Sequence, residues 1–524
     1  MTAASPDSAP ASGADAPLAG VLPLRWSMLL GFLAGALLPL ALAPFHLAPL
    51  GVLSFTLVLA ALWGRTVREA LLVGWIVGLG RYGVGVSWIY VSIHEHGGAS
   101  VLLAGAMVAL FVAFMAVFPA LFAAGFAALR PRTLLVAVAA FTATQLGLEW
   151  ILTWFMTGFP WLLAGYTQMD WPLAGWAPVL GVLGVSLLTV ASGCVLWALW
   201  ATRGAGRGIR ALAVGVLLAW LAGAGLARIE WSDPDGAPLD VALVQGAVAQ
   251  ATKWRPESRQ LITDRYLELS APHADADLLL WPEAALTIYA RDNAPFLDRL
   301  GATLAGRDAT LVLGLPDYDI DPAAPRRAVL RNTAIALGAG DGRYVKQRLV
   351  PFGEYVPLEG LLRGLIEFFD MPMSRARPGP AGQAPLRIGS ADGSAGIGMS
   401  MAICYEVAYG ELVRELSAEA GLLSTISNDT WFGDSIGPSQ HLQMARMRAV
   451  ELARPMLRST NDGITALIDH HGRVIDRLPR FEPGVLRGVA QPRTGATPYA
   501  RLGSWPTLLL VLALLAGVLA ARRR

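Results

Sequence analysis

Apolar and polar positions divide the chain into two kinds of segment. Long apolar runs fill its first part, a polar stretch follows, and one more apolar run lies at the end. The runs have about the length, roughly 20 residues, that an α-helix needs to cross the hydrocarbon core of a bilayer. The sequence therefore predicts membrane-spanning helices at 25–43, 48–64, 69–93, 100–129, 133–154, 177–200, 209–227 and 504–521.

The first apolar run has a second interpretation. Residues 41–43 read Ala-Leu-Ala, which resembles the cleavage site of a secretory signal peptide. Pro44 would follow that cut, and the preceding Ala-, Ser- and Pro-rich tail lacks the usual positive charge. We therefore expect a retained helix, with a signal peptide as the alternative, and a disordered tail over 1–24.

Arginine residues indicate the orientation of the predicted helices. They fall in alternate connections, whereas the connections at 44–50 and 94–98 hold no Lys or Arg. Short loops rich in Lys and Arg stay on the cytoplasmic side of a membrane. Both termini are then cytoplasmic, and the polar stretch is periplasmic in a Gram-negative inner membrane. The arginines are Arg65, Arg68, Arg130, Arg132, Arg203, Arg207, Arg210 and Arg522 to Arg524.

Composition supports a membrane protein with a separate polar domain. Hydrophobic residues make up 54% of the 524 residues and charged residues only 15%, and the mean hydropathy is +0.49. Soluble enzymes are less apolar. A net charge of +2 gives no argument for a nucleic-acid partner. We predict seven spans within 25–228, a polar domain over 229–502, and a last span with its arginine tail over 503–524.

The polar domain alternates between strand-like and helix-like segments. Its short apolar segments end at Gly, Pro and Asp, which is typical of strands, and two segments have helical spacing of apolar residues. This alternation predicts an α/β domain of roughly 270 residues with helices packed outside sheets. The predicted strands are 238–248, 276–286, 309–319, 332–350, 395–404 and 421–429, and the predicted helices are 253–270 and 438–453.

The chain has two cysteines, Cys194 in a predicted span and Cys404 in the polar domain, which are not placed to pair. Thiols on the periplasmic side of a membrane tend to be oxidised. A lone thiol there indicates a function, so Cys404 is a candidate nucleophile. Cys194 lies among small apolar residues and is expected to be a packing residue.

A thiol needs a base or a cation beside it before it attacks at neutral pH. Glu283 follows a buried-strand pattern, and Trp281 and Pro282 are expected to desolvate it partly and raise its pKa, which suits a general base. Lys346 leaves another strand and could stabilise an oxyanion, with Glu354 as its ion-pair partner. From spacing alone, each of these residues could equally be structural.

Three quoted segments change that balance. The order of "LLLWPEAAL" (278–286), "YVKQRLVPFGEYVPL" (344–358) and "AICYEVAYGELVREL" (402–416) resembles the nitrilase, or carbon–nitrogen hydrolase, superfamily. The likeness continues through "SNDTWFGDSIGPSQHLQMARMRAVELARP" (427–455). With spans on both sides of the domain, the chain is similar to the bacterial apolipoprotein N-acyltransferases.

This resemblance implies a fold, a reaction and residue roles. The fold would be the αββα sandwich of nitrilases on a membrane domain of about eight helices. The reaction would move an acyl chain from the sn-1 position of a phosphatidylethanolamine-like phospholipid to a cysteine thioester, and then to the amine of the diacylglyceryl-cysteine of an apolipoprotein. This is the last step of bacterial lipoprotein maturation, and it needs no metal or cofactor. We expect a monomer.

By motif match, the resemblance assigns Glu283 as general base and acid, Lys346 as oxyanion stabiliser and Cys404 as nucleophile. It assigns supporting roles in the active site to Glu354, Tyr405 and Glu406, and a role in a lid over the pocket to Trp254.

Other features keep two interpretations each. Residues 361–373 could form a lid at the lipid interface or pack in a core. Arg81 and Glu149, both in predicted spans, could pair or line a lipid entry. His94, Glu95 and His96 could bind a metal, but solvated side chains are the expected case. Residues 469–472 are expected to be a hairpin turn.

Two other functions remain open at this stage. A membrane-tethered amidase could use the same three residues with water as acceptor, although one helix would be a sufficient anchor. A transporter or lipid-binding protein is a further alternative, but it would leave the Glu, Lys and Cys set without use.

Overall fold

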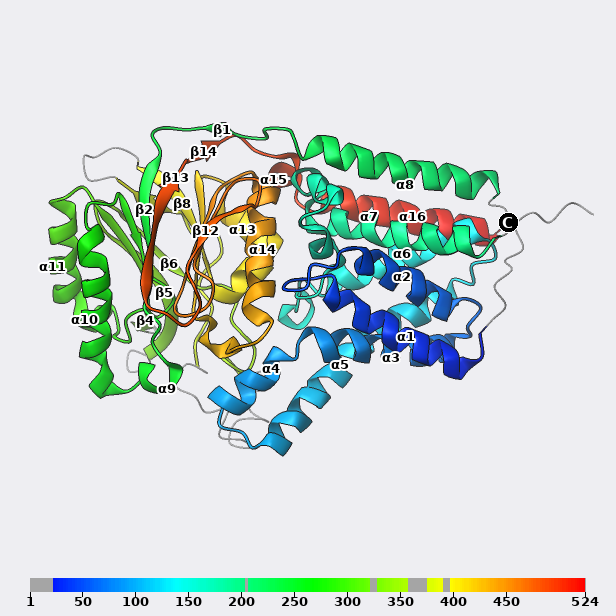
Figure 1. Ribbon diagram of the computed structural model, residues 1–524, viewed down its shortest axis with the longest axis horizontal. Helices are drawn as coiled ribbons and strands as arrows, with labels where there is room; N and C mark the ends of the chain where they lie inside the picture. Colours follow the sequence, from blue (N-terminus) through cyan, green and yellow to red (C-terminus); the bar gives the residue numbers. More distant parts are fainter. Residues whose placement is uncertain (1–21, 203–205, 321–327, 357–374, 390–395, 524) are drawn as a thin grey trace, which may run out of the picture.

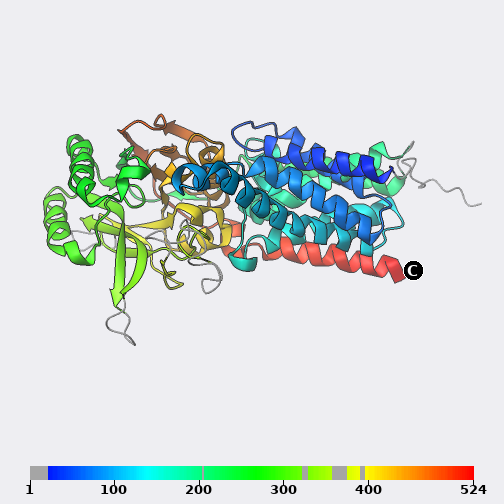
Figure 2. The same cartoon turned by 90° about the horizontal axis from the view of Figure 1, so that it is seen from below.

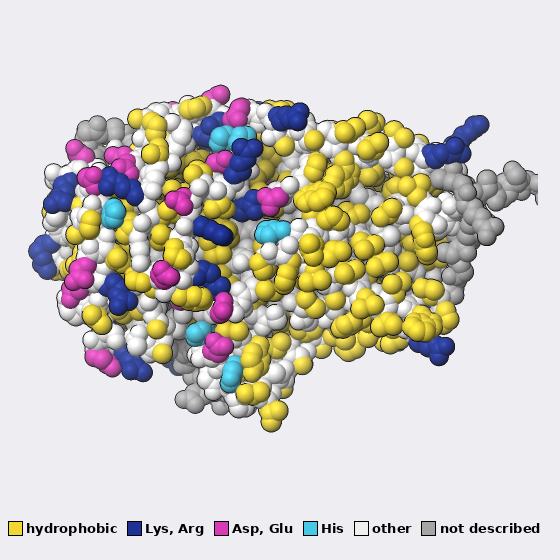
Figure 3. All heavy atoms as spheres, viewed as in Figure 1, with side chains coloured by type: hydrophobic (Ala, Val, Ile, Leu, Met, Phe, Trp, Pro, Cys, Tyr) yellow, Lys and Arg dark blue, Asp and Glu magenta, His cyan; other side chains and the backbone are white. Residues whose placement is uncertain are grey.

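The computed structural model describes residues 22–202, 206–320, 328–356, 375–389 and 396–523. The molecule is elongated, with an α/β part at one end of its long axis and a bundle of helices at the other (Figures 1 and 2). Apolar side chains dominate the surface of the helical part, whereas charged side chains spread over the α/β part (Figure 3). The predicted region 361–373 lies outside the described residues.

Each predicted apolar run contains a helix. The run at 69–93 bends by 58° between α3 and the pair formed by α4 and the π-helical turn η1. The bounds are α1 Leu24–Leu40, α2 Pro49–Leu62, α3 Val67–Gly85, α4 Trp88–Val91, η1 Ser92–His96, α5 Val101–Ala128, α6 Leu134–Ile151, α7 Ala177–Trp200, α8 Arg207–Leu226 and α16 Trp505–Arg523.

The structure supports fewer clear crossings than the eight predicted. Within the described residues, five helices are long and apolar enough to span a membrane, or six if α3 and its bent continuation count as one span. With 17 and 14 residues, α1 and α2 are shorter. At 1.5 Å per residue they are about 26 and 21 Å long, against a hydrocarbon core of roughly 30 Å.

A buried ion pair fixes one irregular segment of the helical part. Arg81 in α3 and Glu149 in α6 are both buried, with 3.6 Å between Nη2 and Oε1. Glu149 also accepts hydrogen bonds from the Ala164 amide at 3.0 and 3.2 Å. Of the two interpretations, the structure therefore favours pairing. The pair anchors the connection between α6 and α7. Another part of this connection contacts the α/β part.

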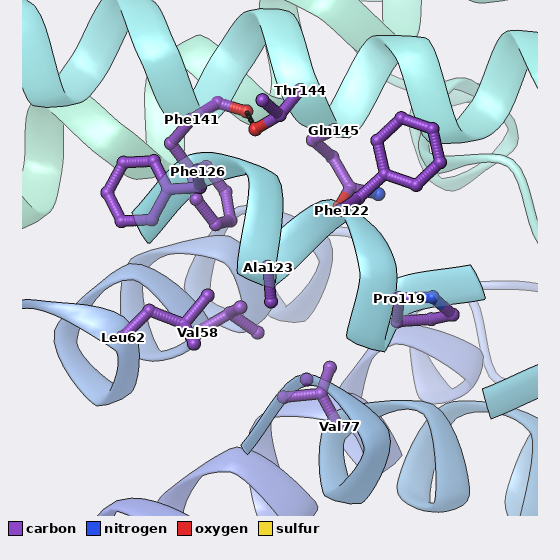
Figure 4. Close-up of a pocket in the computed structure, with 11 residues that line it drawn as sticks. Val58, Leu62, Val77, Pro119, Phe122, Ala123, Phe126, Phe141, Thr144 and Gln145 are labelled. Carbon is purple, nitrogen blue, oxygen red and sulfur yellow. Dashed lines mark hydrogen bonds between the residues drawn. The ribbon is translucent and has the colours of Figure 1, made fainter. Parts of the chain in front are cut away.

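The helices of the bundle pack closely. A Cβ atom added to Gly35 in α1 would lie 2.1 Å from the carbonyl oxygen of Val77 in α3, so only glycine permits this approach. A cavity between α2, α3, α5 and α6, lined by Val58, Val77, Ala123 and Gln145 among others, has a volume of about 20 Å³ (Figure 4). It has room for about one water molecule and is too small for a lipid chain.

The α/β part contains two six-stranded sheets. The first has the strand order β13-β2-β3-β4-β5-β6 and the second the order β12-β11-β10-β9-β8-β7. The bounds are β2 Leu239–Gln245, β3 Leu278–Leu280, β4 Thr310–Ile320, β5 Ala328–Gly338, β6 Arg343–Val345, β7 Leu386–Ile388, β8 Ile397–Ile403, β9 Leu422–Ser427, β10 Met456–Thr460, β11 Ala466–Ile468, β12 Val474–Arg477 and β13 Gly484–Ala490. A short ribbon, β1 Asp233–Pro234 with β14 Arg493–Thr494, is separate.

Helices cover both outer faces of the paired sheets (Figure 1). On one side lie α10 (Arg259–Ser270) and α11 (Ala294–Ala305), which share a core with β2, β3 and β4. On the other lie α13 (Gly410–Leu416) and α14 (Gly437–Leu452), next to the helical part. The predicted layered α/β domain is therefore present, and its α14 layer contacts α7.

Candidate active site

The site forms where strands of the two sheets end. In the first sheet β3 runs parallel to β2 and β4, and in the second β8 runs parallel to β9. Glu283 lies just beyond β3, and Cys404 and Asn428 directly follow β8 and β9. The Asn428 amide donates a hydrogen bond of 2.9 Å to Glu283 Oε2, so the ends of the two sheets meet. Parallel strands bring residues at their carboxyl ends to one edge.

The cation of the site lies between two carboxylates. Lys346, directly after β6, is 1% exposed, and its Nζ lies 3.1 Å from Glu283 Oε1 and 2.9 Å from Glu354 Oε1. Burial alone would lower the pKa of Lys346, but the two carboxylates hold it well above its usual value. The structure therefore keeps a permanent positive charge between Glu283 and Glu354.

Asn332, in the middle of β5, joins the same two carboxylates. Its Nδ2 donates to Glu283 Oε1 at 2.7 Å and to Glu354 Oε1 at 2.8 Å. Burial raises the pKa of Glu283, but Lys346, Asn332 and the Asn428 amide outweigh it, so the net shift is downward. The predicted rise in this pKa is therefore wrong, because the cation and the donors come from distant strands. Glu283 is ionised and ready to accept a proton.

Cys404 occupies a strained turn. It is the first residue of the 3₁₀ turn Cys404–Ala408, and its φ of 54° lies in the left-handed region that residues with a side chain rarely adopt. Cys404 as a residue is partly buried. Burial and the Glu283 carboxylate raise its pKa, and Lys346 acts in the opposite direction. The charges of Glu283 and Lys346 thus have opposite effects on the pKa of the Cys404 thiol.

Glu406 ties the Cys404 turn to the strand that carries Lys346. Its Oε1 accepts hydrogen bonds from the Gln347 amide at 2.7 Å, the Tyr344 hydroxyl at 2.9 Å and the Arg348 amide at 3.0 Å. Its Oε2 accepts one from the Ile403 amide at 2.7 Å. Burial raises the pKa of Glu406 to about 7, although the amides act to lower it. This side chain fixes the two segments relative to each other.

The helical part contacts the same turn. The Tyr405 hydroxyl donates to the Gly158 carbonyl at 3.2 Å, and the Tyr409 hydroxyl donates to the Thr157 carbonyl at 2.9 Å. Trp161 stacks on the Tyr405 ring with 6.3 Å between centroids. Thr157, Gly158 and Trp161 belong to the connection between α6 and α7, which the Arg81–Glu149 pair anchors. The membrane-associated part is therefore a wall of the candidate site.

Trp254 is half-buried at the end of α9 (Gln250–Lys253). Two residues of this segment contact the site. Lys253 is fully buried, and its Nζ lies 3.3 Å from the Glu283 carbonyl and from Asn428 Oδ1. Gln250 Oε1 accepts a hydrogen bond from Asn428 Nδ2 at 3.0 Å. Burial lowers the pKa of Lys253 to about 8. The structure thus brings together five of the predicted site residues: Glu283, Lys346, Glu354, Cys404 and Glu406. Tyr405 contacts the helical part, and Trp254 follows Lys253.

Sequence reasoning missed several residues of this network. Asn428 and Asp429 are the last residues of the predicted strand 421–429 and lie just beyond β9, so polar side chains at a strand end were an available signal. Asn332 lies within a strand and His441 within a helix, and only the fold shows that they face the site.

Among the described residues, one other group has the composition of a metal site: Glu230, His470 and His471. The Glu230 carboxylate accepts hydrogen bonds from both imidazoles at 2.9 and 3.0 Å and from Arg493 at 2.8 Å. Three donors satisfy it, and the Arg493 cation would repel a metal ion. His94 instead faces the Ala99 carbonyl, and His96 packs against Trp431.

Comparison with known proteins agrees with this architecture. Residues 240–499 match the model of the carbon–nitrogen hydrolase family, so the α/β part belongs to that class. Residues 34–195 match the model of the apolipoprotein N-acyltransferase N-terminal domain. The chain is 45% identical to the apolipoprotein N-acyltransferase of Pseudomonas syringae pv. tomato over 503 residues, which cover 94% of this chain and 97% of the relative.

Two further relatives carry the same name. The Pseudomonas aeruginosa PAO1 protein is 45% identical over 493 residues, with 94% of both chains covered. The Methylococcus capsulatus protein is 40% identical over 505 residues, with 95% of this chain and 96% of the relative covered. The chain belongs to the apolipoprotein N-acyltransferase family.

Proposed function

We propose that this chain transfers a fatty acyl group from a phospholipid to the N-terminal amine of an apolipoprotein through a thioester on Cys404. The observation that carries the proposal is the contact of Tyr405, in the Cys404 turn, and of the nearby Tyr409 with the connection between the apolar helices α6 and α7. An acyl chain in a bilayer reaches a thiol only where the thiol lies against the lipid-embedded part of the enzyme. A soluble substrate would not require this arrangement.

In the first half-reaction, the Cys404 thiol gives its proton to Glu283 as sulfur attacks the ester carbonyl of the phospholipid. The thiol pKa is raised and that of Glu283 is lowered, so proton transfer accompanies attack instead of preceding it. The Lys346 ammonium stabilises the oxyanion of the tetrahedral intermediate. Collapse breaks the ester bond, Glu283 returns the proton to the leaving oxygen, and a lysophospholipid departs.

In the second half-reaction, the free amine of the diacylglyceryl-cysteine attacks the thioester carbonyl. Glu283 takes a proton from the amine, Lys346 again stabilises the oxyanion, and the departing Cys404 sulfur regains the proton. The product carries an amide. Glu354 accepts hydrogen bonds from Lys346 and Asn332, and Asn332 also donates to Glu283. Glu354 and Asn332 therefore keep Lys346 and Glu283 in place.

The same proposal includes finer features. The donor is a phosphatidylethanolamine-like lipid acylated at sn-1, the α/β part faces the periplasm, and both termini are cytoplasmic. The chain acts as a monomer. The boundaries at 24, 228 and 502 divide tail, membrane helices and catalytic domain, and Trp254 shields the pocket from water.

The test uses the purified full-length protein in phosphatidylethanolamine vesicles with a diacylglyceryl-cysteinyl peptide. We expect the peptide to gain one acyl mass in a form that hydroxylamine does not release, and Cys404→Ala to transfer none. Free fatty acid from the wild type with an unmodified peptide would mean that water is the acceptor, and the enzyme would be a hydrolase.

A further inference from the structure

We propose that His441 is a positioning residue for the Cys404 turn: its neutral imidazole donates from Nε2 to the Cys404 carbonyl, while Arg458 and Asp429 hold its other side. This inference rests on Cys404 being the nucleophile of the proposed function. It assigns His441 no part in proton transfer.

The cluster lies beneath the nucleophile and is fully buried. Asp429, His441 and Arg458 are each at most 1% exposed. His441 Nε2 lies 3.1 Å from the Cys404 carbonyl oxygen, and its Nδ1 lies 3.1 Å from both Arg458 Nη2 and Asp429 Oδ1. Arg458 Nη2 donates to Asp429 Oδ2 at 2.6 Å. A buried ion pair therefore contacts the ring on the side away from Cys404.

The donors and acceptors determine the tautomer. A carbonyl oxygen only accepts, so Nε2 must carry a proton, and a guanidinium only donates, so Nδ1 must be free to accept. Asp429 Oδ1 already accepts a hydrogen bond from the Ser427 hydroxyl at 2.6 Å, and it could accept one from Nδ1 as well only if the ring carried two protons. An imidazolium would place a second cation against Arg458. Burial and Arg458 accordingly lower the pKa of His441.

The residue types alone resemble a Cys-His-Asp triad, in which histidine removes the thiol proton. The geometry contradicts that role. The nitrogen that faces Cys404 already carries a proton and donates it to the carbonyl, so it has no lone pair for the thiol. Glu283 therefore remains the base, and His441 holds the main chain of the nucleophile.

The turn needs this support because Cys404 has a φ of 54°. Fixing its carbonyl fixes the direction of the following peptide, and with it the place of the sulfur relative to Glu283. The helical part supports the same unit, since Trp161 stacks on the His441 ring at 5.7 Å between centroids and on the Tyr405 ring at 6.3 Å. The nucleophile turn is thus held from below by His441 and from the side by Trp161.

The variants His441→Gln and His441→Phe test this role. Glutamine retains an N–H donor near the place of Nε2, and phenylalanine retains the ring without a donor. The matched control is His470→Gln, another histidine whose Nε2 faces an oxygen, but outside the site. The readout is alkylation of Cys404 by iodoacetamide, with Cys404→Ala as the blank. Cys194 is buried and contributes little.

We expect His441→Phe to slow alkylation and acylation by about 10- to 100-fold, the effect of losing one buried hydrogen bond. KM for the lipid should not change in His441→Phe. The rates of His441→Gln should stay within a few-fold of the wild-type rates, and the control His470→Gln should have wild-type rates. If both variants instead lost alkylation and acylation equally, down to the rate of a thiol without a general base, the proposal would be overturned in favour of a catalytic histidine. Alkylation needs no lipid, so this result is independent of whether acyl transfer itself is found.

A measurement on the wild type keeps the proposal testable if the variants fail to fold. In protein with ¹⁵N-labelled histidine in nanodiscs at pH 7, the nitrogen shifts of a buried, non-exchanging histidine should show a neutral ring protonated at Nε2. A spectrum in which every histidine is an imidazolium or is protonated at Nδ1 would overturn the proposal.

Discussion

Asn332→Leu removes a side chain that, like Lys346, donates to both Glu283 and Glu354, while keeping a similar shape. A hydrogen bond to a charged group contributes about 1.5–3 kcal/mol. Without the bond of 2.7 Å to Glu283, the pKa of Glu283 should rise, because Asn332 is one of the groups that lower it. The loss of transition-state positioning should slow acyl-enzyme formation by about 10- to 100-fold at pH 7.

The assay is the single-turnover rate at which Cys404 gains an acyl mass from phosphatidylethanolamine, measured from pH 5 to pH 8. The wild type should keep its rate at the acidic end, since Glu283 stays ionised there, and Asn332→Leu should lose rate further as the pH falls. The matched control is Asn293→Leu, an asparagine whose side chain donates to the Tyr289 carbonyl outside the site. A wild-type rate in Asn332→Leu at every pH would refute the role given to this amide.

Three further predictions concern the other carboxylates of the site and the packing of the helices. Glu283→Gln should abolish acylation because the base is lost, whereas Glu354→Gln, which keeps a hydrogen-bonding oxygen for Lys346, should slow it by about 10- to 100-fold; equal rates in intact-mass kinetics would contradict this division. Burial raises the pKa of Glu406 to about 7 in the folded protein, above its value of 4.5 in the unfolded chain. Its contribution to the free energy of unfolding is therefore full below pH 4.5 and is lost as the pH rises through 7, by up to about 3 kcal/mol. The Tm difference between Glu406→Gln and the wild type should therefore move in favour of the variant from pH 5 to pH 8, and a constant difference would contradict the burial argument. Gly35→Leu should force α1 away from Val77 in α3 and lower the Tm by several degrees, whereas Gly105→Leu, at an open position on α5, should not.

Local sequence patterns predicted the elements that carry the site better than they predicted its electrostatics. The buried-strand patterns before Glu283 and before Cys404 correspond to β3 and β8. Glu283 and Cys404 were expected at strand ends, and they lie there. The pKa of Glu283 was predicted to rise, because the sequence shows only its neighbours Trp281 and Pro282. The groups that lower it are far away along the chain.

The same limit applies to the positioning residues. The pairing of β5 with β6 places Asn332 at the site. Thr333 of β5 lies opposite Val345 of β6, so Asn332 lies next to Lys346, which follows Val345. No spacing in the sequence encodes that register. The number of membrane crossings is limited in another way, since hydropathy finds the apolar runs but not where helices such as α2 end. Only the fold shows the bend of 58° between α3 and the pair formed by α4 and η1.

The central claim is that Cys404 carries the acyl group, and the intact mass of the protein tests it most directly. The purified wild type and Cys404→Ala are incubated with phosphatidylethanolamine without an acceptor peptide. We predict that the wild type gains one fatty acyl mass, that hydroxylamine removes it, and that the variant gains none. A wild type that remains unmodified while its Cys404 still reacts with iodoacetamide would contradict a thioester formed from this lipid.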